Sequence, residues 1–398
     1  MNSKFARKRQ KVWGTMTFSL SHDVERRRLF LTLFTALALA IVSVAPASAD
    51  SSDPVAEPGY LLEDRWEDAS YVSEKYQEAY AGSMYQIVKE TVEARRFHEK
   101  GYYGNGIDVA LIDSGVVPVG GLDGGQIING LDVSFESQSD DLRYMDTYGH
   151  GTHLAGIIVG YDSSTGFMGM APGSRLLNVK VANHEGAVDV TQVIAAIDWV
   201  VEHRNNNGMN VRVINLAYGT DSSQNWKTDP LSAAVERAWR AGIVVVVAAG
   251  NDGNATALRD PAFNPYVIAV GASDSNHSPE TRDDFVASFS NCGTEYRYVD
   301  VLAPGRSIIS LRNPGSVADV EFPKARIGDE LFLGSGTSQA SAVVSGAVAL
   351  ILDRYPKATP DMVKAALMGT SDRIDTNNKF CSQAGVIDLH RFLDEYEA

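Results

Sequence analysis

The stretch GSGTSQASAVVSGAVALIL, from Gly334 to Leu352, decides the fold more clearly than any other part of this chain. After Ser338 it continues as a run rich in Ala, Val, Leu and Ile, with no proline before Pro356. The run predicts a buried helix with Ser338 in its first turn. Serine is also a favoured N-cap, so this stretch alone leaves two roles open for Ser338, a helix cap or a nucleophile.

The sequence before this helix alternates between apolar strands and amphipathic helices. Residues 243–250 are apolar on both faces, which is typical of the middle of a parallel sheet. The alternation predicts one α/β domain with a mostly parallel central sheet flanked by helices. The expected strands are 107–113, 175–182, 211–219, 243–250 and 266–272, and the expected helices are 85–100, 149–160, 189–204, 231–242 and 359–369, besides the Ser338 helix. In the last of these helices, Thr359 is the expected cap and Pro360 the first helical residue.

The first 49 residues have the pattern of an export signal rather than of a folded domain. Arg26, Arg27 and Arg28 precede an apolar run over residues 29–44, and small residues end at Ala49. This order predicts a signal peptide cut after Ala49 and a secreted protein, with a retained membrane anchor as the alternative. The paired arginines fit the twin-arginine export route and the general route equally well.

Composition limits the partners of the remaining chain. The 398 residues are 44% hydrophobic and carry a formal net charge of −15, and the basic leader makes the rest more acidic still. This balance argues against a nucleic-acid partner. Residues 50–82 are polar and acidic and are interpreted as a linker or a short pro-arm, followed by a folded domain over 83–398.

The chain has two cysteines, Cys292 and Cys381. In an exported protein the simplest interpretation is one disulfide between them. Two unpaired, partly buried thiols are the alternative.

Four polar residues stand at the edges of the expected elements. Asp113 ends a strand, His150 opens a helix, Asn251 follows the strand 243–250, and Ser338 begins the helix described above. In open parallel sheets functional residues gather where strands end and helices begin. These four residues are therefore the candidate site.

Each candidate also has a plainer interpretation. Asp113 could cap a turn, and Asn251 could be a turn residue before Gly253. His150 and His153 are three residues apart and could be a metal pair, but a zinc site would want a third ligand and usually a nearby Glu, which the segment HGTH lacks.

Taken together, the segments resemble those of the subtilisin-like serine proteases, or subtilases. Asp113 lies in IDSG, His150 in HGTH, Asn251 in AAGN and Ser338 in GTS, in the order of that family. The resemblance covers roughly residues 83–390. It implies a secreted serine endopeptidase acting on protein or peptide substrates, with a narrow-specificity processing protease or a non-catalytic binding module on the same fold as alternatives.

The chemistry of these residue types agrees with that resemblance. A serine hydroxyl needs a base to take its proton, and an imidazole such as His150 can exchange a proton near neutral pH. Asp113 would orient the imidazole and stabilise its charged form. The Ser338 amide and the Asn251 side chain would stabilise the oxyanion of the intermediate.

The resemblance also places the substrate. An extended peptide would pair with strand edges and put side chains into pockets. Tyr218 stands where many relatives have Leu, and Asp252 near the pocket mouth could favour basic side chains. We expect a monomer without a cofactor; calcium is common in the family, but the sequence offers no convincing ligand set. The matching walls are Ala217, Tyr218, Gly219, Ala248, Ala249 and Gly250.

Two features depart from the family pattern. Gln339 follows the nucleophile where Met is usual, which predicts better tolerance of peroxide because Met is readily oxidised. The segment before the folded domain is also short for a prodomain with its own core. We therefore expect folding without a full prodomain, or with a short arm.

Overall fold

The computed structural model describes residues 65–66, 80 and 82–397, apart from Ser223, His277, Pro279, Asp375 and Asn377. The described residues belong to one compact unit, residues 56–398. The expected signal peptide, residues 1–49, lies outside the described residues, as does most of the expected linker or arm, residues 50–82.

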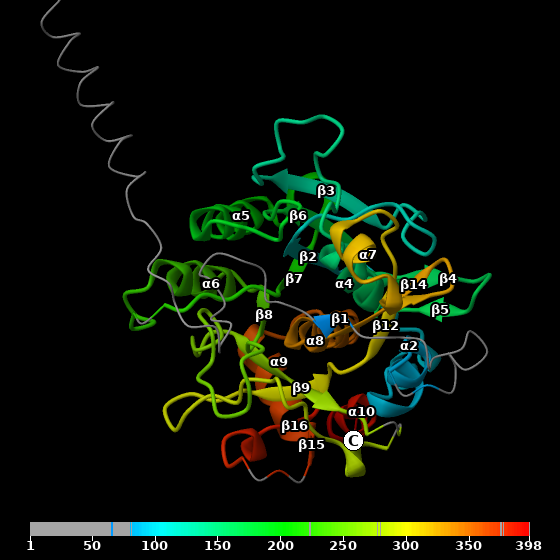
Figure 1. The fold of residues 1–398 in the computed structure, drawn as a ribbon. Helices are drawn as coiled ribbons and strands as arrows, with labels where there is room; N and C mark the ends of the chain where they lie inside the picture. The colour runs from blue at the N-terminus through cyan, green and yellow to red at the C-terminus, as the bar shows by residue number, and fades with distance from the viewer. Residues whose placement is uncertain are drawn as a thin grey trace, which may run out of the picture. The chain divides into compact units, whose positions relative to one another are not determined.

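A mostly parallel sheet forms the centre of the unit (Figure 1). Its strand order is β15-β16-β11-β9-β8-β7-β2-β6-β3, and β10 pairs with β9. The seven strands from β11 to β3 are all parallel to their neighbours. The strands are β2 (Asp108–Asp113), β3 (Ile127–Asp132), β6 (Arg175–Lys180), β7 (Val211–Leu216), β8 (Val244–Ala248), β9 (Ile268–Asp274), β10 (Phe285–Val286), β11 (Val301–Pro304), β15 (Asp372–Arg373) and β16 (Gly385–Val386).

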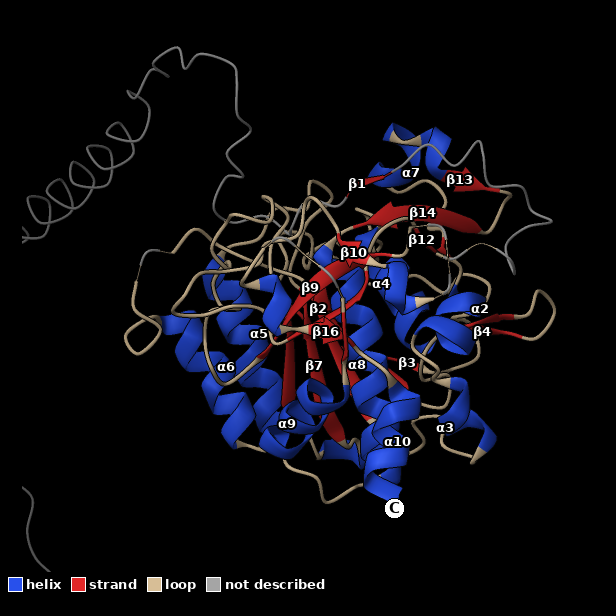
Figure 2. Ribbon diagram, turned by 90° about the horizontal axis from the view of Figure 1, so that it is seen from below, coloured by secondary structure: helices blue, strands red, loops and turns tan. Residues whose placement is uncertain are grey.

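Helices cover both faces of this sheet (Figure 2). Helices α4 (His150–Val159) and α8 (Thr337–Arg354) pack on one face, and α5 (Val190–His203) and α6 (Pro230–Arg240) pack on the other. Every residue of α8 from Thr337 to Leu352 is buried, which explains its apolar sequence. The predicted α/β fold with a parallel sheet flanked by helices is confirmed.

The remaining helical segments are short or lie toward the chain ends. Asp189, Asp229 and Thr359 cap α5, α6 and α9 through their side chains, and the expected start of α9 at Pro360 is confirmed. These segments are α2 (Met84–Gln86), η2 (Ile87–Thr91), α3 (Arg95–Glu99), η3 (Asn206–Gly208), η4 (Thr281–Asp283), α7 (Val317–Glu321), η5 (Pro323–Ala325), α9 (Pro360–Thr370), η6 (Cys381–Gln383) and α10 (Leu389–Glu397).

The single helix expected over residues 85–100 was wrong. The structure divides it into α2, the π-helical turn η2 and α3. The break lies at Glu93, whose φ of 54° is left-handed and cannot continue a right-handed helix.

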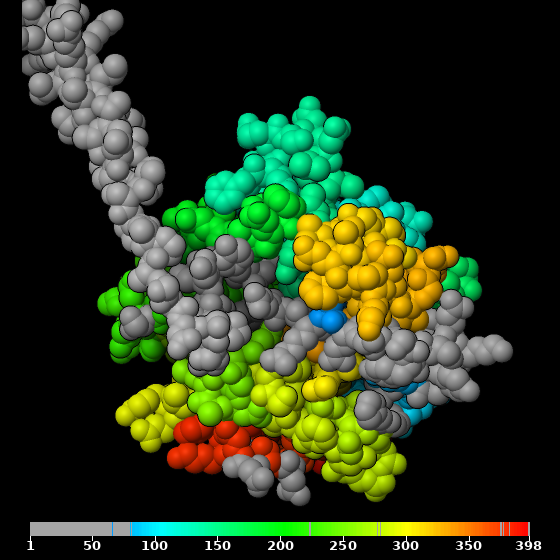
Figure 3. All heavy atoms as spheres, viewed as in Figure 1, coloured from blue at the N-terminus to red at the C-terminus, as the bar shows by residue number. Residues whose placement is uncertain are grey.

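A second, antiparallel sheet precedes the Ser338 helix and was not predicted. Its path is β1-β14-β12, with β13 also on β14. Figure 3 shows residues 65–66 in blue against the yellow-orange lobe that carries this sheet. The strands are β1 (Arg65–Trp66), β12 (Ile308–Leu311), β13 (Arg326–Ile327) and β14 (Leu331–Ser335), and a separate hairpin joins β4 (Tyr161–Asp162) to β5 (Phe167–Met168).

Candidate active site

Asp113 and His150 meet at the carboxyl edge of the parallel sheet. Asp113 is the last residue of β2, and His150 is the first residue of α4. The distance from His150 Nδ1 to Asp113 Oδ1 is 2.7 Å, and both side chains are fully buried. The Ser114 amide donates a second bond of 2.7 Å to the same carboxylate oxygen. A buried carboxylate on Nδ1 fixes the ring and leaves Nε2 as the nitrogen that can exchange a proton.

The turn before α4 is organised by Asp146. Its Oδ1 accepts bonds of 2.7 Å from Ser114 Oγ and from the Gly149 amide, and its Oδ2 accepts one of 2.8 Å from the Thr152 amide. Asp146 thus satisfies the first amides of α4, as a capping carboxylate does, and ties them to the residue after Asp113. The sequence analysis did not single out Asp146.

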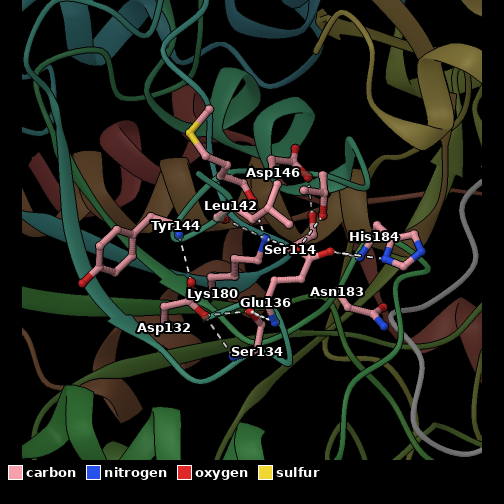
Figure 4. Close-up of polar contacts among 12 residues, drawn as sticks. Ser114, Asp132, Ser134, Glu136, Leu142, Tyr144, Asp146, Lys180, Asn183 and His184 are labelled. Atoms are coloured by element: carbon pink, nitrogen blue, oxygen red, sulfur yellow. Dashed lines mark hydrogen bonds and ion pairs between the residues drawn. The ribbon is translucent and has the colours of Figure 1, made fainter. Parts of the chain in front are cut away.

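A buried lysine, Lys180, lies close to Ser114 and Asp146 (Figure 4). Lys180 pairs in register with Asp113 across β6 and β2, and its side chain is fully buried. Its Nζ donates to Glu136 Oε2 over 2.6 Å and also to the Met145 carbonyl. Burial opposes the charge of Glu136, but the bonds from Lys180 and Thr147 outweigh it and lower the pKa of that carboxyl. The ionised form of Glu136 is therefore favoured beside Lys180, and the bond from Lys180 to the Met145 carbonyl holds the loop that carries Asp146.

Ser338 is the second residue of α8, so the interpretation of Ser338 as the helix cap was wrong. The N-cap is Gly336, which has no side chain to cap with. Ser338 is fully buried, and its Oγ makes no hydrogen bond with any residue that the structure describes. Catalytic hydrogen bonds often tighten only when substrate binds. The first amides of a helix have no partner within the helix and stand at the positive end of its dipole, so the first turn of α8 favours a nearby anion.

Asn251 connects the end of β8 to the start of α8. Its Oδ1 accepts bonds of 2.9 Å from the Thr337 amide and 3.0 Å from Thr337 Oγ1. The Gly250 amide donates to the same Thr337 hydroxyl over 3.2 Å. Because the oxygen end of the Asn251 amide is held by α8, its NH₂ end is the one that can donate to an oxyanion.

The expected substrate walls extend from the ends of β7 and β8. Ala217, Tyr218 and Gly219 follow β7, while Ala249 and Gly250 follow β8. Next along the chain, Thr220 forms an antiparallel bridge with Asp260, and the Arg259 amide donates to the Ala249 carbonyl over 3.0 Å. Backbone hydrogen bonds of Arg259 and Asp260 therefore connect the two walls to each other.

Asp252 has a partner that the sequence did not reveal. Arg259 Nε donates to Asp252 Oδ2 over 2.7 Å, and its NH1 pairs with Asp221. The positive charge of Arg259 is thus shared between two carboxylates. The idea that Asp252 by itself favours a basic substrate side chain has no support in this geometry.

His153 lies one turn after His150 and is fully buried. Burial, with the nearby charge of His150, lowers the pKa of His153 to about 3, so this ring is neutral. The Trp66 ring meets it edge-on at 5.3 Å between centroids.

Among the described residues, no three His, Cys, Asp or Glu side chains are arranged to hold a metal ion. Within the same part of the chain, no helix is long and apolar enough to cross a membrane.

Cys292 and Cys381 form a disulfide in the structure. The bond joins the loop after β10 to η6, which leads into the edge strand β16. The two cysteines are 89 residues apart in the sequence, so the bond cross-links two distant segments.

Comparison with known proteins gives a consistent family. The model of the subtilase family matches residues 104–386. The chain is 39% identical over 279 residues to the serine protease AprX of Bacillus subtilis, covering 68% of this chain and 62% of that protein. It is 33% identical over 287 residues to subtilisin DY of Bacillus licheniformis, covering 71% of this chain and 90% of that protein. The match thus spans less than two thirds of AprX and most of subtilisin DY.

Proposed function

This chain belongs to the subtilase family, and from that premise we propose that it is a secreted serine endopeptidase that hydrolyses peptide bonds in protein or peptide substrates. The observation that carries the proposal is the buried 2.7 Å bond between His150 Nδ1 and Asp113 Oδ1. A neutral imidazole held in this way has its second nitrogen prepared to act as a base. We propose action as a monomer, without nucleic acid and without a catalytic cofactor.

The proposed reaction uses this chain's own groups. His150 takes the proton of Ser338 as Oγ attacks the substrate carbonyl, and Asp113 stabilises the imidazolium. The oxyanion lies at the first turn of α8, where the Ser338 amide and the Asn251 NH₂ group donate to it; losing one such donor typically costs about 3–4 kcal/mol of barrier. His150 then protonates the leaving amine, and water releases the acyl group by the reverse sequence.

The test is the intact mass of the purified protein after treatment with a sulfonyl fluoride. We expect one adduct on the wild type and none on Ser338→Ala. Ser345→Ala is the matched control. Ser345 is another buried serine of α8, but its hydroxyl donates to Asn215 and it is not part of the proposed triad. A folded wild type without an adduct, or an adduct that persists in Ser338→Ala, would contradict the proposed role of Ser338.

We also propose that residues 1–49 are an export signal and that residues 50–82 act as a short pro-arm. The basic stretch and apolar run before Ala49 support the first proposal. Pairing of Arg65 and Trp66 with β14 supports the second. N-terminal sequencing of the secreted protein tests the first, with Asp50 expected as the first residue of the initial product. Refolding yield with and without residues 50–79 tests the second, and equal yields would rule out a folding role.

A further inference from the structure

An apolar pocket of about 440 Å³ lies at the end of α8 that is remote from Ser338. It is formed by the last turns of α8, the loop 355–358, α9 and α10. Figure 2 shows α9 and α10 at the same end of the molecule, and the two helices are in contact. Ser338 and Arg354 are about 24 Å apart along the axis of α8. The pocket is therefore separate from the candidate active site.

The walls of this pocket are almost entirely apolar. Val363 and Phe392 are buried, whereas Met362 is 59% exposed and Tyr396 is 50% exposed. Ligand pockets in proteins usually have volumes of about 300–1,000 Å³ and apolar walls with a few polar groups. A stable protein interface, by contrast, covers about 800 Å² on each partner. The size and the lining therefore fit the chain of a small amphiphile better than a protein partner.

The loop between α8 and α9 is held by hydrogen bonds from Arg212. Its NH1 donates to the Pro356 carbonyl and its NH2 donates to the Ala358 carbonyl, both over 2.8 Å. The Thr359 side chain then caps α9. A pocket whose backbone is already held in place loses little conformational freedom when a ligand binds. The pocket is therefore preformed.

Two cations stand among the apolar residues of the pocket. Lys357 is exposed and forms no ion pair with any residue that the structure describes. The Arg354 guanidinium lies over the rings of Tyr102 and Tyr355, at 5.3 Å and 4.9 Å from their centroids. Ring faces hold a guanidinium without neutralising its charge. Both cations can therefore attract an anion.

No aspartate or glutamate lines the pocket within the part of the chain that the structure describes. Asp353 and Asp361 come directly before lining residues, but other groups bind them. Asp353 Oδ2 accepts bonds of 3.1, 3.0 and 3.0 Å from the amides of residues 103–105, and Asp361 Oδ1 accepts one of 2.9 Å from Trp239 Nε1. In a chain with a net charge of −15, the pocket is thus a local site of positive charge. An anionic head group complements that charge.

We infer that this pocket binds a free long-chain carboxylate, with the acyl chain on the apolar walls and the carboxylate at Lys357 and Arg354. Burying the chain removes apolar surface from water, and the two cations fix the orientation of the head group. A cationic amphiphile would meet like charge at the same place. The inference goes beyond the proposed endopeptidase function and does not depend on it, because no residue of the candidate active site lines the pocket.

Calorimetric titration of the full chain with dodecanoate tests the inference. Ser338→Ala protein is used to prevent self-digestion, and the amphiphile stays well below its critical micelle concentration. At pH 8 we expect one molecule per chain with a Kd on the order of 10 μM, which is ordinary for a ligand of this size. Decanoate should bind about tenfold more weakly because it buries two fewer methylene groups. Dodecyltrimethylammonium should also bind at least about tenfold more weakly, because its head group is a cation.

Changes at two exposed residues show whether the ligand is in this pocket. Lys357→Glu should weaken dodecanoate binding about tenfold, since repulsion replaces attraction at the head group. Met362→Asp should weaken it by a similar factor, because it places a charge on the apolar wall. The matched controls are Lys227→Glu, at an exposed lysine, and Met368→Asp, on the same helix as Met362. Neither control residue lines the pocket, so both variants should keep an unchanged Kd.

Three results would overturn the inference. The first is the absence of saturable binding, equal affinity for dodecanoate and dodecyltrimethylammonium, or a Kd that neither pocket variant changes. The second is a dimer, seen by sedimentation without amphiphile, that Met362→Asp dissociates and Met368→Asp does not; a second copy of the chain would then fill the pocket. The third is sedimentation of the protein with phosphatidylglycerol vesicles without binding of dodecanoate, which would make a membrane surface the partner.

Discussion

Asp284 is a buried carboxyl group outside the proposed site that titrates far from its ordinary range. Burial raises the pKa of Asp284 to about 8, and the nearby carboxylates Asp283 and Asp274 add to the effect. The folded protein therefore holds a proton at Asp284 that the unfolded chain releases above about pH 4. Because the unfolded state binds fewer protons in this window, the free energy of unfolding falls as the pH rises from about 4 to about 8, and it stays lower above that.

Asp284→Asn should remove this part of the pH dependence. We expect the melting temperature of Ser338→Ala protein, used to prevent self-digestion, to fall between pH 5 and pH 9. With Asp284→Asn added, the fall should be smaller by an amount that corresponds to at least about 1 kcal/mol. Asp123→Asn is the control, since Asp123 is an exposed carboxylate that is not among the groups that shift the pKa of Asp284. Calorimetry at both pH values checks this, and equal slopes for all three proteins would show that Asp284 is ionised in the folded state.

Gln339 directly follows Ser338 and is fully buried in α8. An amide has no sulfur to oxidise, whereas a Met at this position would become a bulkier, polar sulfoxide next to Ser338. We expect the wild type to keep most of its activity in dilute peroxide and Gln339→Met to lose most of its activity under the same treatment. Activity per labelled Ser338 is the measurement. Rapid inactivation of the wild type at a rate equal to that of the variant would show that the sensitive group lies elsewhere.

At the scale of single elements, the sequence predicted what strong local patterns determine. The all-apolar strand β8 and the long helix α8 came from runs of buried residues, and the Thr359 cap from side-chain chemistry. The two-residue strands β1 and β13 are too short for any periodicity to show, because a strand pattern needs at least four residues.

Features that depend on residues distant in the sequence were not predicted either. Apolar spacing in residues 85–100 predicted a helix, but Glu93 has a left-handed backbone conformation that this spacing does not reveal. The fully buried Lys180 donates to Glu136, which lies 44 residues earlier in the chain. Local pattern located the four candidate residues, whereas Asp146 and Lys180, which support the segments next to Asp113 and His150, were found only in the tertiary structure.

The disulfide between Cys292 and Cys381 acts on one edge of the large sheet. It ties the loop after β10 to η6, just before β16, a two-residue strand that pairs with β11. Replacing both cysteines with serine should lower the free energy of unfolding by about 2–5 kcal/mol, since a cross-link closing a long loop restricts the unfolded chain. Denaturant titration in the Ser338→Ala background checks this. An unchanged midpoint would mean that the bond does not form in the protein.

At the scale of the whole molecule, the small antiparallel sheet brings the N-terminal segment to the proposed site. Arg65 and Trp66 pair with Ser335 and Gly334, directly before the helix that carries Ser338. The Trp66 ring also lies 5.0 Å from the Phe332 ring, between centroids. Segments more than 260 residues apart in the sequence are thus joined close to Ser338. The edge of β14 that β1 covers is an edge to which an extended peptide could otherwise add.

Replacing Trp66 with alanine should therefore help long substrates to compete with β1 for the edge of β14. Losing the contacts of the ring weakens β1 on β14, so we expect KM for extended peptides to fall several-fold while kcat per labelled Ser338 stays constant. The rate of modification by a small sulfonyl fluoride should not change, because that reagent does not need the β14 edge.

Tyr296→Ala, which removes a highly exposed aromatic ring, is the control. Intact mass must show that residues 65–66 are retained in each sample. Equal KM values for Trp66→Ala and wild type would show that β1 and the substrate occupy different edges, and a parallel change in sulfonyl fluoride reactivity would show that Trp66 acts on the triad instead.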